Sequence, residues 1–170
     1  KLLLRYPKAV STIEEMAKQS VSKGFRIYGP SGSGKSTIAK FISEMVGYKF
    51  IAFPCASVRD SNDWFYTREV KDGTTGYEMT ELAKALNSGD NFVILLDEIN
   101  RMEEPSAVNG LLTVLDEQKY FMVGTNRYEV NGANFLFATA NIGMQYSGTI
   151  RIDEAVNNRF PFLLQLDDCP

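Results

Sequence analysis

The fold of this chain is decided by the stretch Gly29-Pro30-Ser31-Gly32-Ser33-Gly34-Lys35-Ser36, which fits the pattern G-x-x-x-x-G-K-[ST]. Residues 25–28 before it are typical of a short strand, and residues 37–46 after it carry apolar side chains at helical spacing. A strand on one side and a helix on the other distinguish a phosphate-binding loop from an ordinary glycine-serine turn.

Such a loop suits a triphosphate for physical reasons. Glycines let consecutive backbone N–H groups turn towards phosphate oxygens, and the positive end of the following helix dipole faces the same charge. We expect Lys35 to reach the β- and γ-phosphates and the Ser36 hydroxyl to ligate Mg²⁺. The sequence therefore predicts a nucleotide site formed by Gly29, Pro30, Ser31, Gly32, Ser33, Gly34, Lys35, Ser36 and Thr37.

Length and composition are those of an ordinary globular domain. The chain has 170 residues, of which 44% are hydrophobic and 23% charged, and its net charge is −3. This charge indicates no nucleic-acid partner, although it leaves a local basic patch open. The absence of histidine excludes His-based catalysis, and the isolated Cys55 and Cys169 are typical of reduced thiols in a cytosolic protein. No apolar stretch is long enough to span a membrane.

Strand and helix patterns alternate along the chain, which predicts a parallel sheet with crossover helices. We expect five strands, at residues 25–28, 49–53, 92–96, 135–139 and 162–166, and helices at 11–21, 37–46, 80–86, 106–115 and 155–159. The first helix is expected to begin at Ser11, which has capping-box spacing to Glu14, and the last to be capped by Asp153. Two β-hairpins are predicted, at 63–70 with 75–79 and at 120–123 with 127–130.

The apolar run at 92–96 ends in Asp97 and Glu98, which we interpret as the second half of the site. Ligands of open α/β sheets bind at the carboxyl ends of the strands, beside the glycine loop. There Asp97 would hold Mg²⁺ and Glu98 would polarise an attacking water. In isolation an Asp-Glu pair after a strand is more typical of simple capping; the phosphate loop upstream favours the catalytic interpretation.

Together these segments resemble the AAA+ ATPases, within them the MoxR-like and dynein-related group that includes the McrB-like motors. The resemblance spans roughly residues 11–166. It rests on four segments: Gly29 to Ser36 (Walker A), Leu95-Leu96-Asp97-Glu98-Ile99-Asn100-Arg101 (Walker B with an Asn-Arg extension), Phe137-Ala138-Thr139-Ala140-Asn141 (sensor-1 strand) and Asn157-Asn158-Arg159-Phe160 (arginine-finger segment).

The resemblance implies a P-loop NTPase fold, a three-layer αβα sandwich with a mainly parallel five-stranded sheet and two hairpin inserts. It further implies ATP hydrolysis with Mg²⁺, in which Lys35, Glu98, Asn141 and Arg159 are catalytic, Ser36 and Asp97 hold the metal, and Arg159 acts on the neighbouring subunit's site. The parent protein would form a homo-oligomeric ring, expected to be hexameric and cytoplasmic, that remodels or matures a client protein as a chaperone.

Some assignments within the resemblance stay open. Arg159 is either the arginine finger or simply a helix C-terminal cation or salt-bridge partner. Arg101 and Arg151 are further candidates for a contact with a neighbouring subunit. Tyr66 and Tyr77, on the first hairpin, either grip a client or pack across strands. Residues 1–170 correspond to the α/β subdomain only, so we expect a fragment of a longer protein that lacks the family's helical lid.

Three other functions share parts of this pattern. A McrB-like motor would use the same ATPase chemistry to translocate on nucleic acid. A small-molecule kinase would share the phosphate loop, but it needs neither the Asp-Glu pair nor an Asn-tipped strand. A nucleotide-gated structural module would bind without hydrolysis. A GTPase is disfavoured because no Asn-Lys-x-Asp guanine-binding motif occurs.

Overall fold

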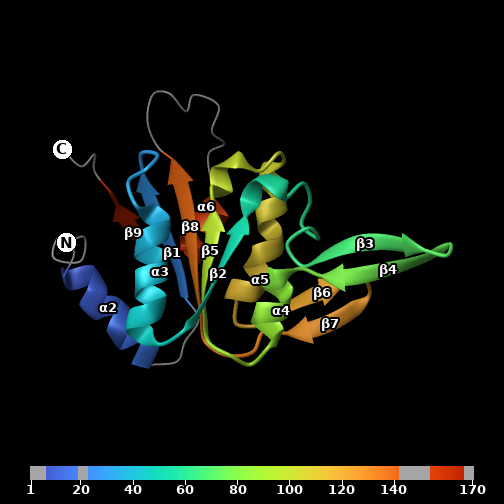
Figure 1. Cartoon of the computed structure of the whole chain (residues 1–170), viewed down its shortest axis with the longest axis horizontal. Coiled ribbons are helices and arrows are strands. Elements are labelled where there is room, and N and C mark those ends of the chain that lie inside the picture. The colour runs from blue at the N-terminus through green and yellow to red at the C-terminus, as the bar shows by residue number, and fades with distance from the viewer. Residues whose placement is uncertain (1–6, 19–22, 142–153, 167–170) are drawn as a thin grey trace.

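The structure, a computed structural model, describes residues 7–18, 23–141 and 154–166. At its centre lies a five-stranded sheet of order β2-β5-β8-β1-β9, whose neighbouring strands all run parallel (Figure 1). The strands are β1 (Lys23–Gly29), β2 (Lys49–Pro54), β5 (Phe92–Asp97), β8 (Asn134–Asn141) and β9 (Phe162–Gln165). The α/β class and the five strands predicted from the sequence are confirmed.

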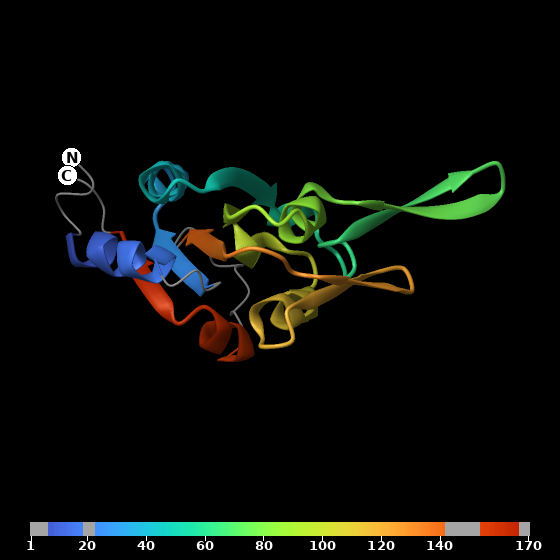
Figure 2. The same cartoon turned by 90° about the horizontal axis from the view of Figure 1, so that it is seen from below.

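Helices cover both faces of the sheet, which gives the predicted three layers. The α-helices are α2 (Pro7–Lys18), α3 (Lys35–Val46), α4 (Glu81–Asn87), α5 (Leu112–Leu115) and α6 (Glu154–Arg159); 3₁₀-helices span Cys55–Ser57, Ile99–Arg101 and Pro105–Leu111. Helices α2 and α3 lie on one face, whereas α4, α5 and α6 lie on the other (Figure 2). Within the described ranges no helix has the length and apolar character needed to cross a membrane.

Two apolar cores form because the central strands are buried on both faces. Along β5, Val93 and Leu95 pack with α2 and α3, whereas Ile94 and Leu96 pack with α4 and α5. Strand β8 divides its side chains in the same way. Successive residues of a strand point to opposite faces, so a strand between two helical layers requires a continuous apolar run. This explains why residues 92–96 are apolar without interruption.

Two antiparallel hairpins project from the same side of the molecule (Figures 1 and 2). Strand β3 (Tyr66–Lys71) pairs with β4 (Thr74–Met79), and β6 (Tyr120–Val123) pairs with β7 (Asn126–Glu129). Both predicted hairpins are confirmed, although the first begins at Tyr66 rather than Asp63. The Asp63 carboxylate accepts the backbone N–H groups of Arg59 and Asp60 and so closes a turn before the strand.

The hairpins contact each other through Tyr77. Its ring lies so close to the second hairpin that a Cβ on Gly124 would come within 2.7 Å of it. The rings of Tyr66 and Tyr77 also pack edge to face, with 5.1 Å between their centroids, and Tyr66 is buried. The structure therefore gives these two tyrosines a packing contact, the alternative to client gripping that the sequence left open.

The prediction of an α-helix at 106–115 is wrong over most of that range. Residues Pro105–Leu111 form a 3₁₀-helix, and only Leu112–Leu115 are α-helical. The indole N–H of Trp64 donates to the Ala107 carbonyl at 2.7 Å. This buried hydrogen bond holds the 3₁₀ segment to the turn before β3. A local reason against the α-helix is that Ser106, Asn109 and Gly110 are weak α-helix formers.

The helix predicted to begin at Ser11 starts one turn earlier, at Pro7, and Ser11 lies inside α2. A proline suits the first turn of a helix because its missing N–H has no intrahelical partner there. The capping-box interpretation is therefore wrong. Val21, the end of the predicted helix, and Asp153, the predicted cap of α6, lie outside the described residues.

We predict that Gly110→Ala lowers the free energy of unfolding by about 1–3 kcal/mol, because the site is overpacked by a single methyl group. A Cβ at Gly110 would come within 2.6 Å of the Ser61 carbonyl oxygen and 2.9 Å of the Trp64 ring. Denaturant unfolding measures the difference. The control is Gly76→Ala, where the nearest atom would lie at 3.8 Å and we expect a change within about 0.5 kcal/mol. Equal stability of the two variants would contradict this packing.

Candidate functional site

Most of the site residues predicted from the sequence lie at one edge of the sheet, where three neighbouring strands end. Strand β1 ends at Gly29, β5 at Asp97 and β8 at Asn141, and the sheet order places β8 between the other two. The register pairs Gly29 directly with Asn141. Parallel strands carry their carboxyl ends to the same edge, so residues more than 100 positions apart become neighbours.

A cavity of about 330 Å³ opens at this edge. It is lined by the phosphate loop and by three polar residues at the carboxyl ends of β5 and β8: Ser31, Gly32, Gly34, Lys35, Ser36, Thr37, Asp97, Glu98 and Asn141. The structure therefore brings together both Walker segments and the sensor-1 asparagine that the sequence predicted.

The backbone of the loop has the conformation that its glycines allow. Gly32 and Gly34 have φ angles of 77° and 85°, in the left-handed region that favours glycine. Gly34 caps the start of α3 and, as a glycine, supplies no side-chain bond to the first N–H groups of this helix. These donors and the positive end of the helix dipole are available to an anion at the cavity.

Lys35 points its ammonium group into the centre of the site although its side chain is buried. The Nζ atom donates to the carbonyl oxygens of Gly29 at 3.0 Å and Pro30 at 2.7 Å, and to Oδ1 of Asn141 at 2.7 Å. Burial lowers the pKa of Lys35 from its ordinary value, while the carboxylates of Asp97 and Glu98 oppose that shift. The ammonium thus forms three hydrogen bonds to oxygens of β1, the loop and β8.

Asn141 connects Lys35 to the acidic pair. Its Oδ1 accepts from Lys35, and its Nδ2 donates to Oε1 of Glu98 at 2.7 Å. The other carboxylate oxygen of Glu98 lies 3.2 Å from Nη1 of Arg101. A continuous chain of polar contacts therefore runs from the phosphate loop to the Walker B turn. Asn141 can link the two because its side-chain amide has both an acceptor oxygen and a donor NH₂ group.

Glu98 has an unusual backbone conformation, with φ at 55° and ψ at 51°. A residue with a side chain rarely adopts this left-handed region, and such strain persists only where surrounding contacts hold it. Here the Glu98 N–H donates to the Thr139 hydroxyl at 3.0 Å, and the Arg101 N–H donates to the Glu98 carbonyl at 2.8 Å. The turn places the Glu98 carboxylate beside Asn141.

Thr139 is the site residue that the sequence analysis did not single out. Its side chain is fully buried in β8; the hydroxyl accepts from Glu98 N and donates to Oδ1 of Asp97 at 2.8 Å. One hydroxyl thus orients both acids. The available signal was a hydroxyl residue within an otherwise apolar buried strand, where an unpartnered hydroxyl would be costly.

Asn100 and Arg101, the Asn-Arg extension, lie in the 3₁₀-helix Ile99–Arg101 that follows Glu98. Asn100 is buried and its Nδ2 donates to the Asn141 carbonyl at 3.4 Å, whereas Arg101 is half-exposed beside Glu98. Both residues contact the ends of the strands that form the site. Arg151, the other basic candidate, lies outside the described residues.

Arg159 does not lie at this cavity. It ends α6, and its Nε and Nη2 atoms both lie 3.0 Å from Oδ1 of Asp116, the residue that follows α5. Of the predicted catalytic residues, Lys35, Glu98 and Asn141 are therefore brought together, and Arg159 is placed elsewhere on the same chain.

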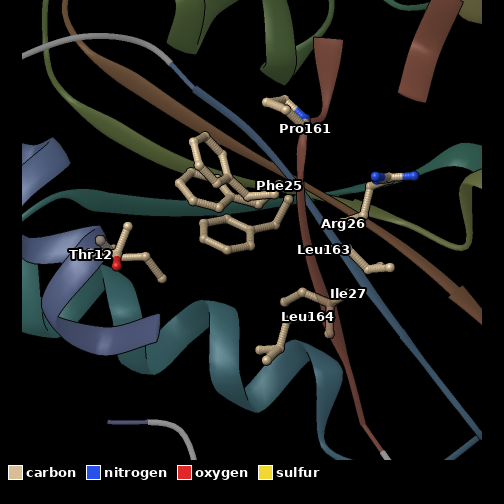
Figure 3. A pocket seen from close by; sticks show the side chains of 10 residues that line it. Thr12, Phe25, Arg26, Ile27, Pro161, Leu163 and Leu164 are labelled. Atoms are coloured by element: carbon tan, nitrogen blue, oxygen red, sulfur yellow. The ribbon is translucent and has the colours of Figure 1, made fainter. Parts of the chain in front are cut away.

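A second cavity, of about 340 Å³, lies between α2 and β9 and has a different character (Figure 3). Its walls include the rings of Phe25, Phe137 and Phe162, with Phe25 stacked on Phe137 at 4.6 Å. Apart from Thr12 and Arg26, whose Nη1 already donates to Asn157, the lining is apolar and offers few partners for the oxygens of a triphosphate. The polar cavity at the phosphate loop is therefore the candidate site.

A family model described as AAA domain (dynein-related subfamily) matches residues 24–160 of this chain. BssE of Thauera aromatica, whose name describes it as a chaperone, is 28% identical over 145 residues, covering 85% of this chain and 50% of that protein. An uncharacterised protein of Staphylococcus aureus strain USA300 is 29% identical over 171 residues, covering 93% and 62% respectively. The chain thus spans only part of the length of these curated relatives.

Solved structures show the same fold at lower identity. RuvB of Thermotoga maritima superposes with a TM-score of 0.63 at 20% identity, covering 94% of this chain and 44% of that one. NtrX of Brucella abortus, solved in complex with ADP, superposes with a TM-score of 0.64 at 22% identity, covering 94% and 35%.

We predict that Thr139→Val lowers the free energy of unfolding by about 1–3 kcal/mol, because it leaves the part-buried Glu98 N–H and an Asp97 oxygen without their partner. Denaturant unfolding measures this loss. Thr139→Ser retains the hydroxyl and serves as the control, with the loss of one methyl group as its only cost. A valine variant as stable as the serine variant would show that the hydroxyl does not hold the acidic turn.

Proposed function

This chain belongs to the dynein-related subfamily of AAA domains, and on that premise we propose that it binds ATP with Mg²⁺ and hydrolyses the terminal phosphoanhydride bond. One observation carries the proposal. The Lys35 ammonium and the Glu98 carboxylate line a single polar cavity and are joined through the amide of Asn141, by hydrogen bonds of 2.7 Å on each side.

The phosphate loop would hold the triphosphate through Gly29 to Thr37. In the structure Lys35 bonds to two carbonyl oxygens and one amide oxygen, each a neutral acceptor. Phosphate oxygens are charged acceptors and form stronger hydrogen bonds with an ammonium group. Lys35 would therefore exchange some of these bonds for contacts with the β- and γ-phosphates when the nucleotide binds.

Ser36 and Asp97 are the residues that would hold Mg²⁺. Both line the cavity, and a hydroxyl and a carboxylate are the hard oxygen donors that this ion takes alongside substrate phosphates. Asp97 is oriented for this purpose by the hydrogen bond from Thr139 to its Oδ1. The ion, when bound, neutralises charge on the phosphate oxygens.

Glu98 would orient and polarise the attacking water, with Asn141 as its partner. The Asn141 amide donates to Glu98 and accepts from Lys35, so it is positioned to respond to both the base and the phosphate-binding lysine. A nucleotide that draws Lys35 towards its phosphates would alter this contact. This gives a physical basis for the sensor role that the resemblance implies.

We further propose that the parent protein assembles into a ring, expected to be hexameric, in which Arg159 completes the neighbouring subunit's site. Arg159 lies outside the chain's own cavity and is one-third exposed, as a group that acts on another subunit must be. The chaperone name of the relative from Thauera aromatica supports a client protein as the target of remodelling. The likeness to RuvB is one of fold and assigns no DNA substrate.

We predict that Lys35→Ala weakens ATP binding by at least about 100-fold, because it removes charge-assisted hydrogen bonds to the phosphates. Titration of a fluorescent ATP analogue, with circular dichroism to verify folding, measures the effect. Lys40→Ala, an exposed lysine of the same helix, is the matched control and should bind like the wild type. Micromolar affinity retained by a folded Lys35→Ala variant would overturn the phosphate-loop assignment.

We predict that Glu98→Gln preserves ATP binding and lowers the rate of hydrolysis by about 10²–10⁴-fold, the usual contribution of a general base. Phosphate release under saturating ATP and a separate binding titration distinguish the two effects. Glu103→Gln, an exposed glutamate that pairs with Arg59, is the control and should hydrolyse ATP normally. If Glu98→Gln hydrolysed ATP at the wild-type rate, Glu98 would not be the base.

A further inference from the structure

We propose that Asp116 is a positioning residue that orients the Arg159 guanidinium for its contact with the neighbouring subunit's nucleotide. The inference rests on the proposed function, in which Arg159 acts between subunits. It assigns a role to an acidic residue outside the cavity and outside the Walker and sensor segments. The observations that carry it are the geometry of the Asp116–Arg159 contact and the separate attachment of the Arg159 backbone.

The contact holds the guanidinium along one edge only. Nε and Nη2 of Arg159 both lie 3.0 Å from the same oxygen of Asp116. A guanidinium has five N–H donors in a rigid plane, so this arrangement leaves three of them unused by Asp116. The Arg159 side chain remains 34% exposed. Among the described residues the group is therefore fixed in orientation by Asp116 while its other edge is left for a second anion.

The backbone of Arg159 is held in place independently of Asp116. A Cβ on Gly24 would come within 2.3 Å of the Arg159 carbonyl oxygen, so the end of α6 packs directly on the backbone of β1. Arg26, also on β1, donates from Nη1 to Oδ1 of Asn157 in α6 at 2.7 Å, and Phe160 is fully buried. These contacts keep α6 attached to the sheet whether or not Asp116 is present.

Asp116 is fixed from the other side. Its backbone N–H donates to the Leu112 carbonyl at 2.9 Å, which places it at the end of α5, and its own side chain is 43% exposed. An ion pair this exposed contributes little to folding stability. Removal of the Asp116 carboxylate should therefore free the orientation of the guanidinium without releasing α6 or unfolding the chain.

A mixing experiment on the assembled protein tests this role. An acceptor subunit with Arg159→Ala keeps its own site but supplies no arginine, and a donor subunit with Glu98→Gln supplies the arginine but cannot hydrolyse ATP. Mixing the two should restore phosphate release. Asp116→Ala is then placed in the donor or in the acceptor, and Asp116→Asn in the donor serves as the conservative variant.

We expect Asp116→Ala in the donor to lower the restored kcat by about 10-fold, the usual effect of removing a residue that orients a catalytic group. The same change in the acceptor should leave the restored rate unchanged from that of the original mixture, in which neither subunit carries a change at Asp116. Asp116→Asn in the donor should retain most of the rate, because an amide oxygen accepts the same two N–H groups.

Three results would overturn the proposal. Equal losses from Asp116→Ala in donor and acceptor would show general structural damage. No loss in the donor would show that Arg159 needs no orientation. If the unmodified donor and acceptor restore no activity, Arg159 does not act between subunits; this failure is distinct from the other two, because it removes the premise taken from the proposed function.

Discussion

The site depends on one hydrogen-bonded chain, from the Lys35 ammonium through the Asn141 amide to the Glu98 carboxylate. Each link is 2.7 Å long and joins a different strand end or loop of the sheet edge. Lysine and glutamate would attract each other without the asparagine, but the amide fixes their separation, because it donates on one side and accepts on the other. The groups proposed to bind phosphate and to activate water are thereby held in one geometry.

The parallel sheet makes this chain possible. Strand β8 lies between β1 and β5, so its last residue, Asn141, lies beside both Gly29 and the acidic turn. The turn itself is strained at Glu98, and the buried Thr139 hydroxyl stabilises it by bonding to Glu98 N and Asp97 Oδ1. The two apolar cores fix β8 from both faces. Packing thus positions the polar groups, and the polar groups carry the proposed chemistry.

Local signals predicted much of this arrangement. The glycine loop, the apolar run at 92–96 and the polar residues after it depend on neighbours in sequence, and they identified the sheet, the hairpins and the lining of the cavity. Features that depend on distant contacts were missed. Thr139 acts through the register of β8 against β5, Trp64 bonds to the Ala107 carbonyl of the 3₁₀-helix, and Asp116 contacts Arg159 from 43 residues away. No local pattern encodes such pairings.

The most direct test of the account is steady-state phosphate release from MgATP, measured as specific activity against protein concentration. The account places the base in one subunit and Arg159 in the next. It therefore predicts specific activity that rises steeply with concentration as assemblies form. Specific activity that stays flat over that range would contradict sites shared between subunits. No phosphate release at any concentration would contradict the ATPase assignment itself.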